Sequence, residues 1–210
     1  MESLKISLII DIHYFANTKY YKYLIRSPHI VLEQYDFHQK RSFSNRSTIA
    51  GANGLINLSV PIQKGRSQKT LTRDIRIANE ENWQLRHWRS ILSSYNNSPW
   101  FKYFSDDLSV VFSKRHGFLL DWNLACFDWV TTKLNLGMSY KLTREWNILP
   151  GAGVIDLRNT IMPGTANPGD QVRYQQVFEN KIGFQPDLSI LDLLFCEGPK
   201  SSVMLLKGLG

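Results

Sequence analysis

Residues 34–64 carry a dense group of polar and basic side chains next to a segment that should be buried. Six of the nine positions from 38 to 46 hold groups that could contact a ligand: His38, Gln39, Lys40, Arg41, Asn45 and Arg46. Arginine offers a planar fork to a phosphate or carboxylate, and lysine offers a point charge. The composition predicts an anion site built from side chains. The alternative is a solvated edge strand with protective charges.

Side-chain alternation narrows this prediction. If residues 41–46 are extended, Arg41 and Asn45 point to one face and Arg46 points to the other. A single ligand could then not meet every basic group unless a turn or bulge intervened. We therefore centre the predicted site on Lys40, Arg46 and their neighbours, completed by side chains from elsewhere in the chain.

Histidines are the candidates for proton transfer, because imidazole titrates near neutral pH. His13 follows an apolar run beside Asp11, and two residues spaced in this way on a strand share a face, so an orienting hydrogen bond is possible. His87 lies between tryptophans in a helical segment, and His38 precedes Lys40. We take His13 and His87 as candidate bases and His38 as a binding residue. The alternative for each is a buried, hydrogen-bonded structural histidine.

Common catalytic and nucleotide-binding motifs are absent. The sequence contains no G-x-x-x-x-G-K-S/T loop, no G-x-G-x-x-G after a strand, and no G-x-S-x-G, H-E-x-x-H or C-x-x-C. No histidine or acidic spacing supports a metal site, so none is predicted. No cofactor can be named. An anion would have to be held by side chains rather than by a glycine-rich backbone.

The elements that position these residues begin with a strand at 4–10, a helix at 16–26 and a strand at 29–34. Strand, helix and strand in close succession predict a parallel crossover. Ligands of such sheets bind outside the carboxyl ends of the strands. Asp11, His13 and residues 34–46 should converge there.

Further along the chain the pattern predicts an α/β fold with a mixed sheet. Strands are expected at 41–50, 55–62 and 71–78, with a hairpin turn at Gly51–Gly54. A helical lobe should span 79–137, with Asn79 as N-cap and Leu85, Trp88, Leu92 and Tyr95 as its first apolar stripe. The tail, 138–210, should be mixed, with a strand at 139–147 and a short apolar helix at 187–195 that ends before Gly198-Pro199.

The segment 148–172 is rich in glycine and proline, which predicts a long irregular loop. Loops of this length in compact domains are usually functional or disordered. Its role is left open. We expect a single domain over residues 1–210, with 1–78 mainly sheet.

Composition limits the partners. The 210 residues carry a net charge of +7, with a pI near 9.4, which favours anionic ligands. No block of five or six like charges occurs, so a small anion is favoured over duplex nucleic acid. No stretch is long and apolar enough to span a membrane. The two cysteines, Cys126 and Cys196, are too few for a disulfide framework, which favours the cytoplasm.

Four segments together resemble the WbqC-like protein family of bacteria. They are Q-K-R-S-F-S-N-R-S-T-I (39–49), G-L-I-N-L-S-V-P-I (54–62), W-x-x-x-H-W-x-S-I-x-x-x-Y-x-x-S-P-x-F (83–101) and L-S-I-L-D-L-L-F-C-E-G-P (188–199). Many members lie in gene clusters for surface polysaccharides, including O-antigen. The resemblance implies a cytoplasmic protein that handles nucleotide-linked sugars. Members often carry a Pro-x-Tyr-x-Pro-like stretch after the first strand, where this chain keeps Tyr14 without either proline.

The sequence is compatible with three functions. The first is an acyl or aminoacyl transferase acting on a nucleotide-linked amino sugar, with Lys40, Arg41 and Arg46 holding a diphosphate or carboxylate. Asn45, Tyr14 and Tyr95 would help to bind or orient the acceptor. The second is a non-catalytic binding or accessory protein. The third, single-stranded nucleic-acid binding, rests only on charge and aromatic content. The first two functions differ in whether His13, His38 and His87 meet in one cleft. If these histidines lie on separate surfaces, the enzyme hypothesis loses most of its support.

Overall fold

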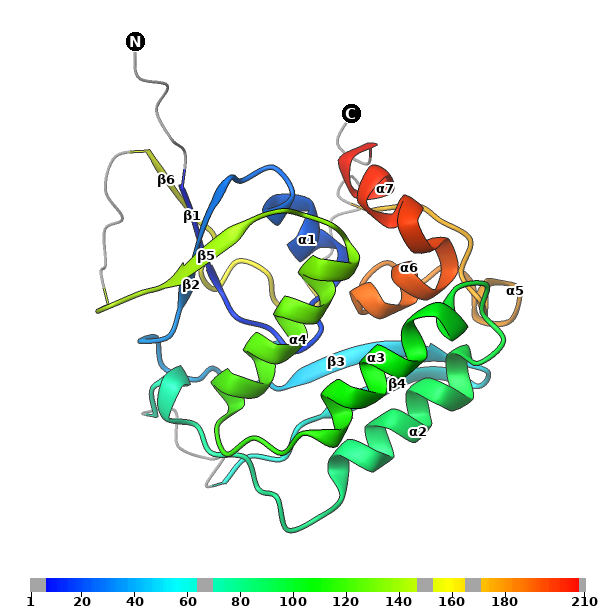
Figure 1. Cartoon of the computed structure of the whole chain (residues 1–210), viewed down its shortest axis with the longest axis horizontal. Helices are drawn as coiled ribbons and strands as arrows, with labels where there is room; N and C mark the ends of the chain where they lie inside the picture. Colours follow the sequence, from blue (N-terminus) through cyan, green and yellow to red (C-terminus); the bar gives the residue numbers. More distant parts are fainter. Residues whose placement is uncertain (1–6, 64–69, 147–152, 165–170, 208–210) are drawn as a thin grey trace.

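The computed structural model describes residues 7–63, 70–146, 153–164 and 171–207. The fold is mixed α/β, as predicted. Four strands form one sheet in the order β5-β2-β1-β6: β5 (Ser139–Leu142), β2 (His29–Glu33), β1 (Ser7–Asp11) and β6 (Val154–Asp156). Every neighbouring pair is parallel (Figure 1). All four strands therefore direct their carboxyl ends to the same edge of the sheet.

The predicted strand–helix–strand unit is confirmed. Helix α1 (Thr18–Leu24) connects β1 to β2, and the Asn17 side chain caps it by accepting a hydrogen bond from the Tyr20 backbone N–H at 3.1 Å. The side chains of β1 are buried on both faces of the sheet, since Leu8, Ile9 and Ile10 are each less than a tenth exposed. Continuous apolar strands of this kind are typical of covered parallel sheets.

The predicted hairpin is also confirmed, but its first strand is shorter than expected. Strand β3 (Arg46–Gly51) pairs antiparallel with β4 (Gly54–Ser59), and Arg46 lies opposite Ser59. Residues 40–45 form turns instead of the start of the strand. The Ser42 hydroxyl donates to the Gln39 carbonyl at 2.9 Å, a local bond of the kind that favours turns over strands.

The prediction of a strand at 71–78 is wrong in detail. A short 3-10 helix, η1 (Thr72–Asp74), occupies the start, and only isolated bridges follow, at Ile77 and Arg76. The backbone N–H groups of this segment bond three different parts of the chain, so no single ladder can form. Ile75 and Ile77 are buried even so.

The helical lobe is confirmed as α2 (Trp83–Tyr95), α3 (Phe101–Ser113) and α4 (Leu119–Lys133). Helix α2 begins later than predicted, because the Asn79 side chain bonds the His116 carbonyl and the Trp83 indole instead of capping the helix. Its buried face also differs from the predicted stripe. Leu85 and Leu92 are 44% and 39% exposed, whereas the neighbouring face packs inward: Trp83, His87, Ile91, Ser94 and Tyr95.

The tail forms the predicted strand and short helix as β5 and α6, and it contributes further elements that were not predicted. Strand β6 lies inside the segment 148–172 and joins the sheet beside β1, while residues 147–152 and 165–170 lie outside the described residues. The chain then forms α5 (Glu179–Ile182), α6 (Ile190–Glu197), η3 (Gly198–Lys200) and α7 (Ser201–Lys207). Helix α6 is almost entirely buried and contacts α1, α3 and β3 (Figure 1). In the described part of the chain, no helix has the length and apolarity needed to cross a membrane.

Candidate functional site

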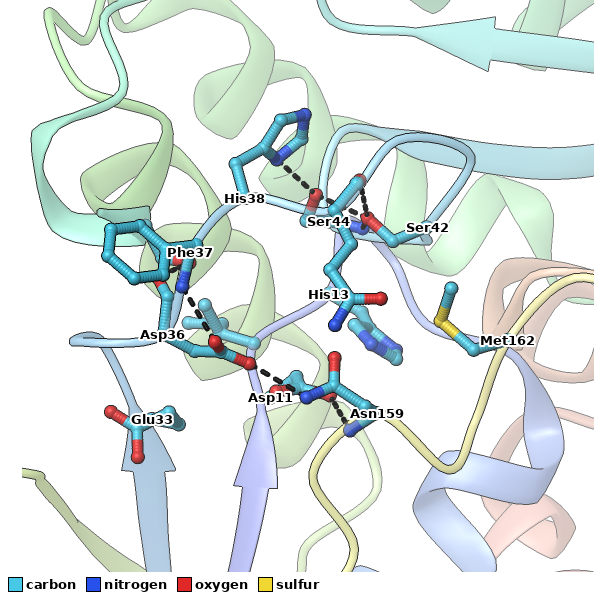
Figure 2. A pocket seen from close by; sticks show the side chains of 13 residues that line it. Asp11, His13, Glu33, Asp36, Phe37, His38, Ser42, Ser44, Asn159 and Met162 are labelled. Carbon is cyan, nitrogen blue, oxygen red and sulfur yellow. Dashed lines mark hydrogen bonds between the residues drawn. The ribbon is translucent and has the colours of Figure 1, made fainter. Parts of the chain in front are cut away.

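A small polar cavity opens where β1 and β2 end, and we name it the acidic cavity. Its volume is about 30 Å³. Asp11 and Glu33 are the last residues of their strands, and both contribute to its wall. Figure 2 shows the lining: Asp11, Ile12, His13, Glu33, Asp36, Phe37, His38, Gln39, Ser42, Ser44, Thr72, Asn159 and Met162. The site lies where the rule for parallel sheets predicts it.

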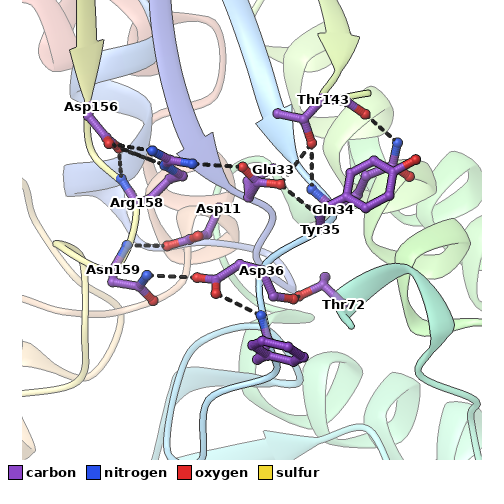
Figure 3. Close-up of polar contacts among 11 residues, drawn as sticks. Asp11, Glu33, Gln34, Tyr35, Asp36, Thr72, Thr143, Asp156, Arg158 and Asn159 are labelled. Carbon is purple, nitrogen blue, oxygen red and sulfur yellow. Dashed lines mark hydrogen bonds and ion pairs between the residues drawn. The ribbon is translucent and has the colours of Figure 1, made fainter. Parts of the chain in front are cut away.

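Asn159 connects two carboxylates of the acidic cavity. Its backbone N–H donates to Oδ2 of Asp11 at 2.6 Å, and its side-chain amide donates to Oδ2 of Asp36 at 2.7 Å (Figure 3). The other oxygen of Asp36 accepts from the Phe37 N–H at 2.7 Å. Asn159 has a φ of 59°, in the left-handed region that asparagine tolerates better than most residues. The segment after β6 therefore closes one side of the cavity.

The Asp11 carboxyl is poised to change charge near neutral pH. Burial raises its pKa from the usual 3.8 to about 7, and the nearby charges of Asp36 and Glu33 act in the same direction. The hydrogen bond from Asn159 opposes this shift. A carboxyl that titrates near 7 suits proton transfer at physiological pH.

Glu33 is committed to a structural network and is not free to act on a ligand. Its Oε1 accepts from the Tyr35 N–H at 2.7 Å and from the Thr143 hydroxyl at 2.8 Å. Its Oε2 lies 3.0 Å from the Arg158 guanidinium, and the side chains of this pair are 0% and 4% exposed. Arg158 also pairs with Asp156 (Figure 3). The network holds the end of β2 to β5 and to the segment after β6.

His13 forms a buried wall of the acidic cavity. It is 4% exposed, and its Nδ1 has no hydrogen-bond partner among the described residues. Its ring packs against Tyr20 and Phe43, with centroids 5.1 and 5.7 Å away. Burial lowers the His13 pKa to about 3, so the ring is neutral at physiological pH. The hydrogen bond that the sequence suggested between Asp11 and His13 does not form in the described structure: Oδ2 of Asp11 accepts from Asn159, and Nδ1 of His13 has no partner.

His38 lies between the acidic cavity and a second, open space. Its Nδ1 is 3.2 Å from the Ser44 hydroxyl, which is 2.8 Å from the Ser42 hydroxyl. Burial and the nearby charge of Arg46 lower the pKa of His38. The ring lines both spaces, so a ligand could occupy both at once.

The second space is a groove of about 370 Å³, which we name the basic groove. It is lined by His38, Lys40, Arg41, Asn45, Arg46, Ser59, Val60, Pro61 and Ile62. Arg41 has a φ of 61°, so the chain reverses there. The Asn45 amide then donates to the Val60 carbonyl at 3.0 Å and fixes the end of the turn on β4. The turn brings Lys40, Arg41 and Arg46 to one groove, which a regular strand could not do.

The charges of the basic groove are available to a ligand. Lys40, Arg41 and Arg46 are exposed, and none of them forms an ion pair with the residues that the structure describes. A pairing partner would have to come from an anion in solution or from the undescribed residues.

Tyr14 and His87 lie apart from both spaces. The Tyr14 hydroxyl is 2.9 Å from Nδ1 of His87, and the rings stack with centroids 5.8 Å apart. His87 also hydrogen-bonds the Ser59 backbone, and burial lowers its pKa to about 4. These contacts connect α2 to the end of β4. His87 therefore does not join His13 and His38 in one cleft, and the enzyme hypothesis loses that support.

Tyr95 is also fully buried and outside both spaces. Its hydroxyl donates to Asp192 at 2.7 Å and accepts from the Ala50 N–H at 3.1 Å. It therefore ties α2 to α6 and β3.

Of the nine site residues predicted from the sequence, six line the two adjoining spaces: His13, His38, Lys40, Arg41, Asn45 and Arg46.

Sequence reasoning did not assign Asp36, Ser44 or Asn159 to the site. Asp36 could have been found, because it follows the second predicted strand by a few residues. Asn159 could not have been found from the sequence, because its position beside Asp11 depends on the pairing of β6 with β1. Among the described residues, no group of three histidine, cysteine, aspartate or glutamate side chains is arranged to hold a metal ion.

Comparisons with known proteins agree with the sequence resemblance. A model of the WbqC-like protein family matches residues 13–162, a range that includes the lining of both spaces except Asp11 and Ile12. An uncharacterized protein of Mycobacterium tuberculosis (strain ATCC 25618 / H37Rv), Rv1507c, is 25% identical, with the match covering 78% of this chain and 81% of that protein. No solved structure matches the chain significantly.

Proposed function

Because this chain belongs to the WbqC-like protein family and its basic groove adjoins an acidic cavity, we propose that it is a transferase of bacterial surface-polysaccharide biosynthesis, including O-antigen. The reaction we propose moves an acyl or aminoacyl group onto a nucleotide-linked amino sugar. One observation supports this proposal most directly. His38 lines both spaces, so the cationic side chains of the basic groove lie next to the acid–base groups of the acidic cavity.

The basic groove supplies the nucleotide contact. Lys40, Arg41 and Arg46 would hold the diphosphate of the sugar nucleotide, since charged hydrogen bonds to phosphate are stronger than neutral ones. The groove has a volume of about 370 Å³, and it contains no glycine-rich phosphate loop. Asn45 keeps the turn in place and need not touch the ligand.

The acidic cavity supplies the proton acceptor. A sugar amine or hydroxyl enters it and attacks the carbonyl carbon of an activated acyl donor, a thioester or an ester. The new bond to carbon forms as the bond to the sulfur or oxygen leaving group breaks. Asp11 takes the proton from the nucleophile and returns it to the leaving group. His13 offers its unpaired Nδ1 as a hydrogen-bond partner.

This assignment differs from the sequence-based choice of base. The sequence named His87 and His13, but the ring of His87 is hydrogen-bonded to Tyr14 and to the Ser59 backbone. Asp11, with a pKa near 7, is better matched to proton transfer than either histidine. A non-catalytic accessory protein would use the same groove and would bind the sugar nucleotide without turnover.

The test measures binding of UDP-glucosamine by calorimetry to wild type, Arg46→Ala and Lys40→Ala. Arg89→Ala is the matched control, because Arg89 is an exposed arginine on α2 that lines neither space. We expect each groove variant to lose about tenfold in affinity, as for one charged hydrogen bond, and the control to lose none. Equal affinity for all four proteins, or no binding by any, contradicts the proposal. Incubation with an acyl thioester and mass spectrometry of the sugar then separates transfer from binding alone.

A further inference from the structure

We propose that the acidic cavity binds a protonated primary amine, so that the acceptor of this protein is an amine and not a hydroxyl. Before the reaction, the bound ammonium releases one proton through Asp11 to solvent and becomes the free amine; the second proton passes through Asp11 to the leaving group. The proposal rests on the function proposed above and names the chemical class of the group that enters the cavity. Three features of the cavity support the proposal: its size, the carboxylates in its wall, and a buried imidazole nitrogen without a partner among the described residues.

The size admits a functional group but not a sugar ring. A cavity of about 30 Å³ holds roughly one or two water-sized groups. The rest of the ligand must therefore lie outside. Phe37 contributes to the wall and is 53% exposed, so its ring offers an apolar surface beside the opening to the body of such a ligand.

The wall contains three carboxylates, those of Asp11, Glu33 and Asp36. Asp11 and Asp36 share one strong donor residue, Asn159, and no lysine or arginine is among the residues that line the cavity. Each carboxylate can accept several hydrogen bonds. Oδ1 of Asp11 accepts none from the described residues, so the cavity has capacity for added N–H groups.

His13 is the independent observation that points to a ligand. Its side chain is more than nine-tenths buried and lines the cavity, and its Nδ1 has no partner among the described residues. A buried polar atom of this kind is unfavourable unless something bonds to it. The ring is neutral, so Nδ1 can accept a hydrogen bond when the proton is on the other nitrogen.

An ammonium group matches this arrangement better than a hydroxyl does. It has three N–H donors and no acceptor, and the cavity offers acceptors on Asp11, Asp36 and His13. A hydroxyl has one donor, so it would leave two of these three acceptors without a hydrogen bond. The positive charge of the amine is also favourable beside two carboxylates. Because His38 also lines the basic groove, one amino-sugar nucleotide could place its amine in the cavity and its diphosphate in the groove.

The experiment compares UDP-glucosamine with UDP-glucose, which has a hydroxyl in place of the amine. Calorimetry at pH 6.5 is carried out on wild type, Asp36→Asn and Asp106→Asn. Asp106 is an exposed aspartate on α3, so its variant makes the same charge change away from the cavity. We expect wild type and Asp106→Asn to bind the amino sugar at least tenfold more tightly than the hydroxyl analogue. Asp36→Asn should lose this preference while keeping its affinity for UDP-glucose.

Methylammonium chloride provides a second readout that needs neither a nucleotide nor a variant. Added to isotope-labelled wild type, it should shift the ring resonances of His13 and leave those of His87 in place. If neither sugar nucleotide binds but methylammonium shifts His13, the proposed function fails and the amine site stands. If both sugar nucleotides bind equally and methylammonium leaves His13 unchanged, the amine site is overturned while the phosphate groove stands. A His13 shift with magnesium chloride but not with methylammonium also overturns it.

Discussion

The hydroxyl oxygen of Tyr14 lies 2.9 Å from Nδ1 of His87, and both side chains are buried. This contact joins the segment after β1 to α2, and the bond between His87 and the Ser59 backbone extends the connection to β4. A predicted base, His87, and a predicted binding residue, Tyr14, thus hold together the elements that carry the site.

Tyr14→Phe should therefore lower stability without weakening ligand binding. Removing the hydroxyl leaves a buried imidazole nitrogen without its partner, which costs about 1–3 kcal/mol in the free energy of unfolding. Urea denaturation measures this loss. Tyr103→Phe is the control, because Tyr103 is 71% exposed and its variant should match wild type. A Tyr14→Phe protein of wild-type stability that no longer binds UDP-glucosamine would return Tyr14 to the binding site.

Arg158→Leu should destabilise the protein strongly. The change leaves the Glu33 carboxylate buried without its ion-pair partner, a loss that typically costs about 3–5 kcal/mol. The matched control is Arg173→Leu, since Arg173 pairs with Glu179 while 66% of its own side chain is exposed. That variant should lose about 1 kcal/mol or less. Equal losses in the two urea midpoints would show that Glu33 does not depend on Arg158.

Stability should depend on pH through Asp11. The folded protein binds the Asp11 proton up to about pH 7, whereas the unfolded chain releases it near pH 3.8. The contribution of Asp11 to stability is therefore fully present below about pH 4 and is lost as pH rises to 7. The slope is at most about 1.4 kcal/mol per pH unit.

Asp11→Asn isolates this effect, because the amide keeps an oxygen that can accept from Asn159 but cannot ionise. Urea unfolding of both proteins at several pH values from 4.5 to 7.5 gives the comparison. We expect wild type to lose stability relative to the variant as pH rises. Parallel curves would mean that the pKa of Asp11 is the same in the folded and unfolded states.

Arg41→Gly and Arg41→Ala should separate the charge of Arg41 from its backbone conformation. Both remove the guanidinium, so both should bind UDP-glucosamine equally weakly. Only glycine adopts a φ of 61° without steric cost, which is about 1–2 kcal/mol for other residues. The glycine variant should therefore be the more stable of the two in urea. If the alanine variant binds as tightly as wild type, the Arg41 side chain does not contact the ligand.

Much of the architecture follows from local patterns. The first strand, the helix after it, the Gly51–Gly54 turn and the helical lobe all form close to where the sequence predicts them. Such features depend on hydrophobic periodicity and on turn and capping residues, which act over a few positions of the chain. The rule for parallel strands then places the site at the carboxyl ends of β1 and β2.

Other features depend on contacts between distant residues. The sequence pattern could not show that the turn at Arg41 gathers three cations in one groove, or that Asn159 reaches two carboxylates more than a hundred residues earlier in the chain. His13 and His87 have the same side chain and both looked suited to proton transfer. Burial beside a cavity left Nδ1 of His13 without a partner, while the Tyr14 hydroxyl and the Ser59 backbone bond His87.

The sequence by itself determined the class of fold, the family and the residue types available for anion binding. Only the tertiary structure decided which of those residues meet. The physical reason is that hydrogen-bond partners, burial and the resulting pKa values are set by neighbours from other strands and helices, and their identity depends on strand order and packing.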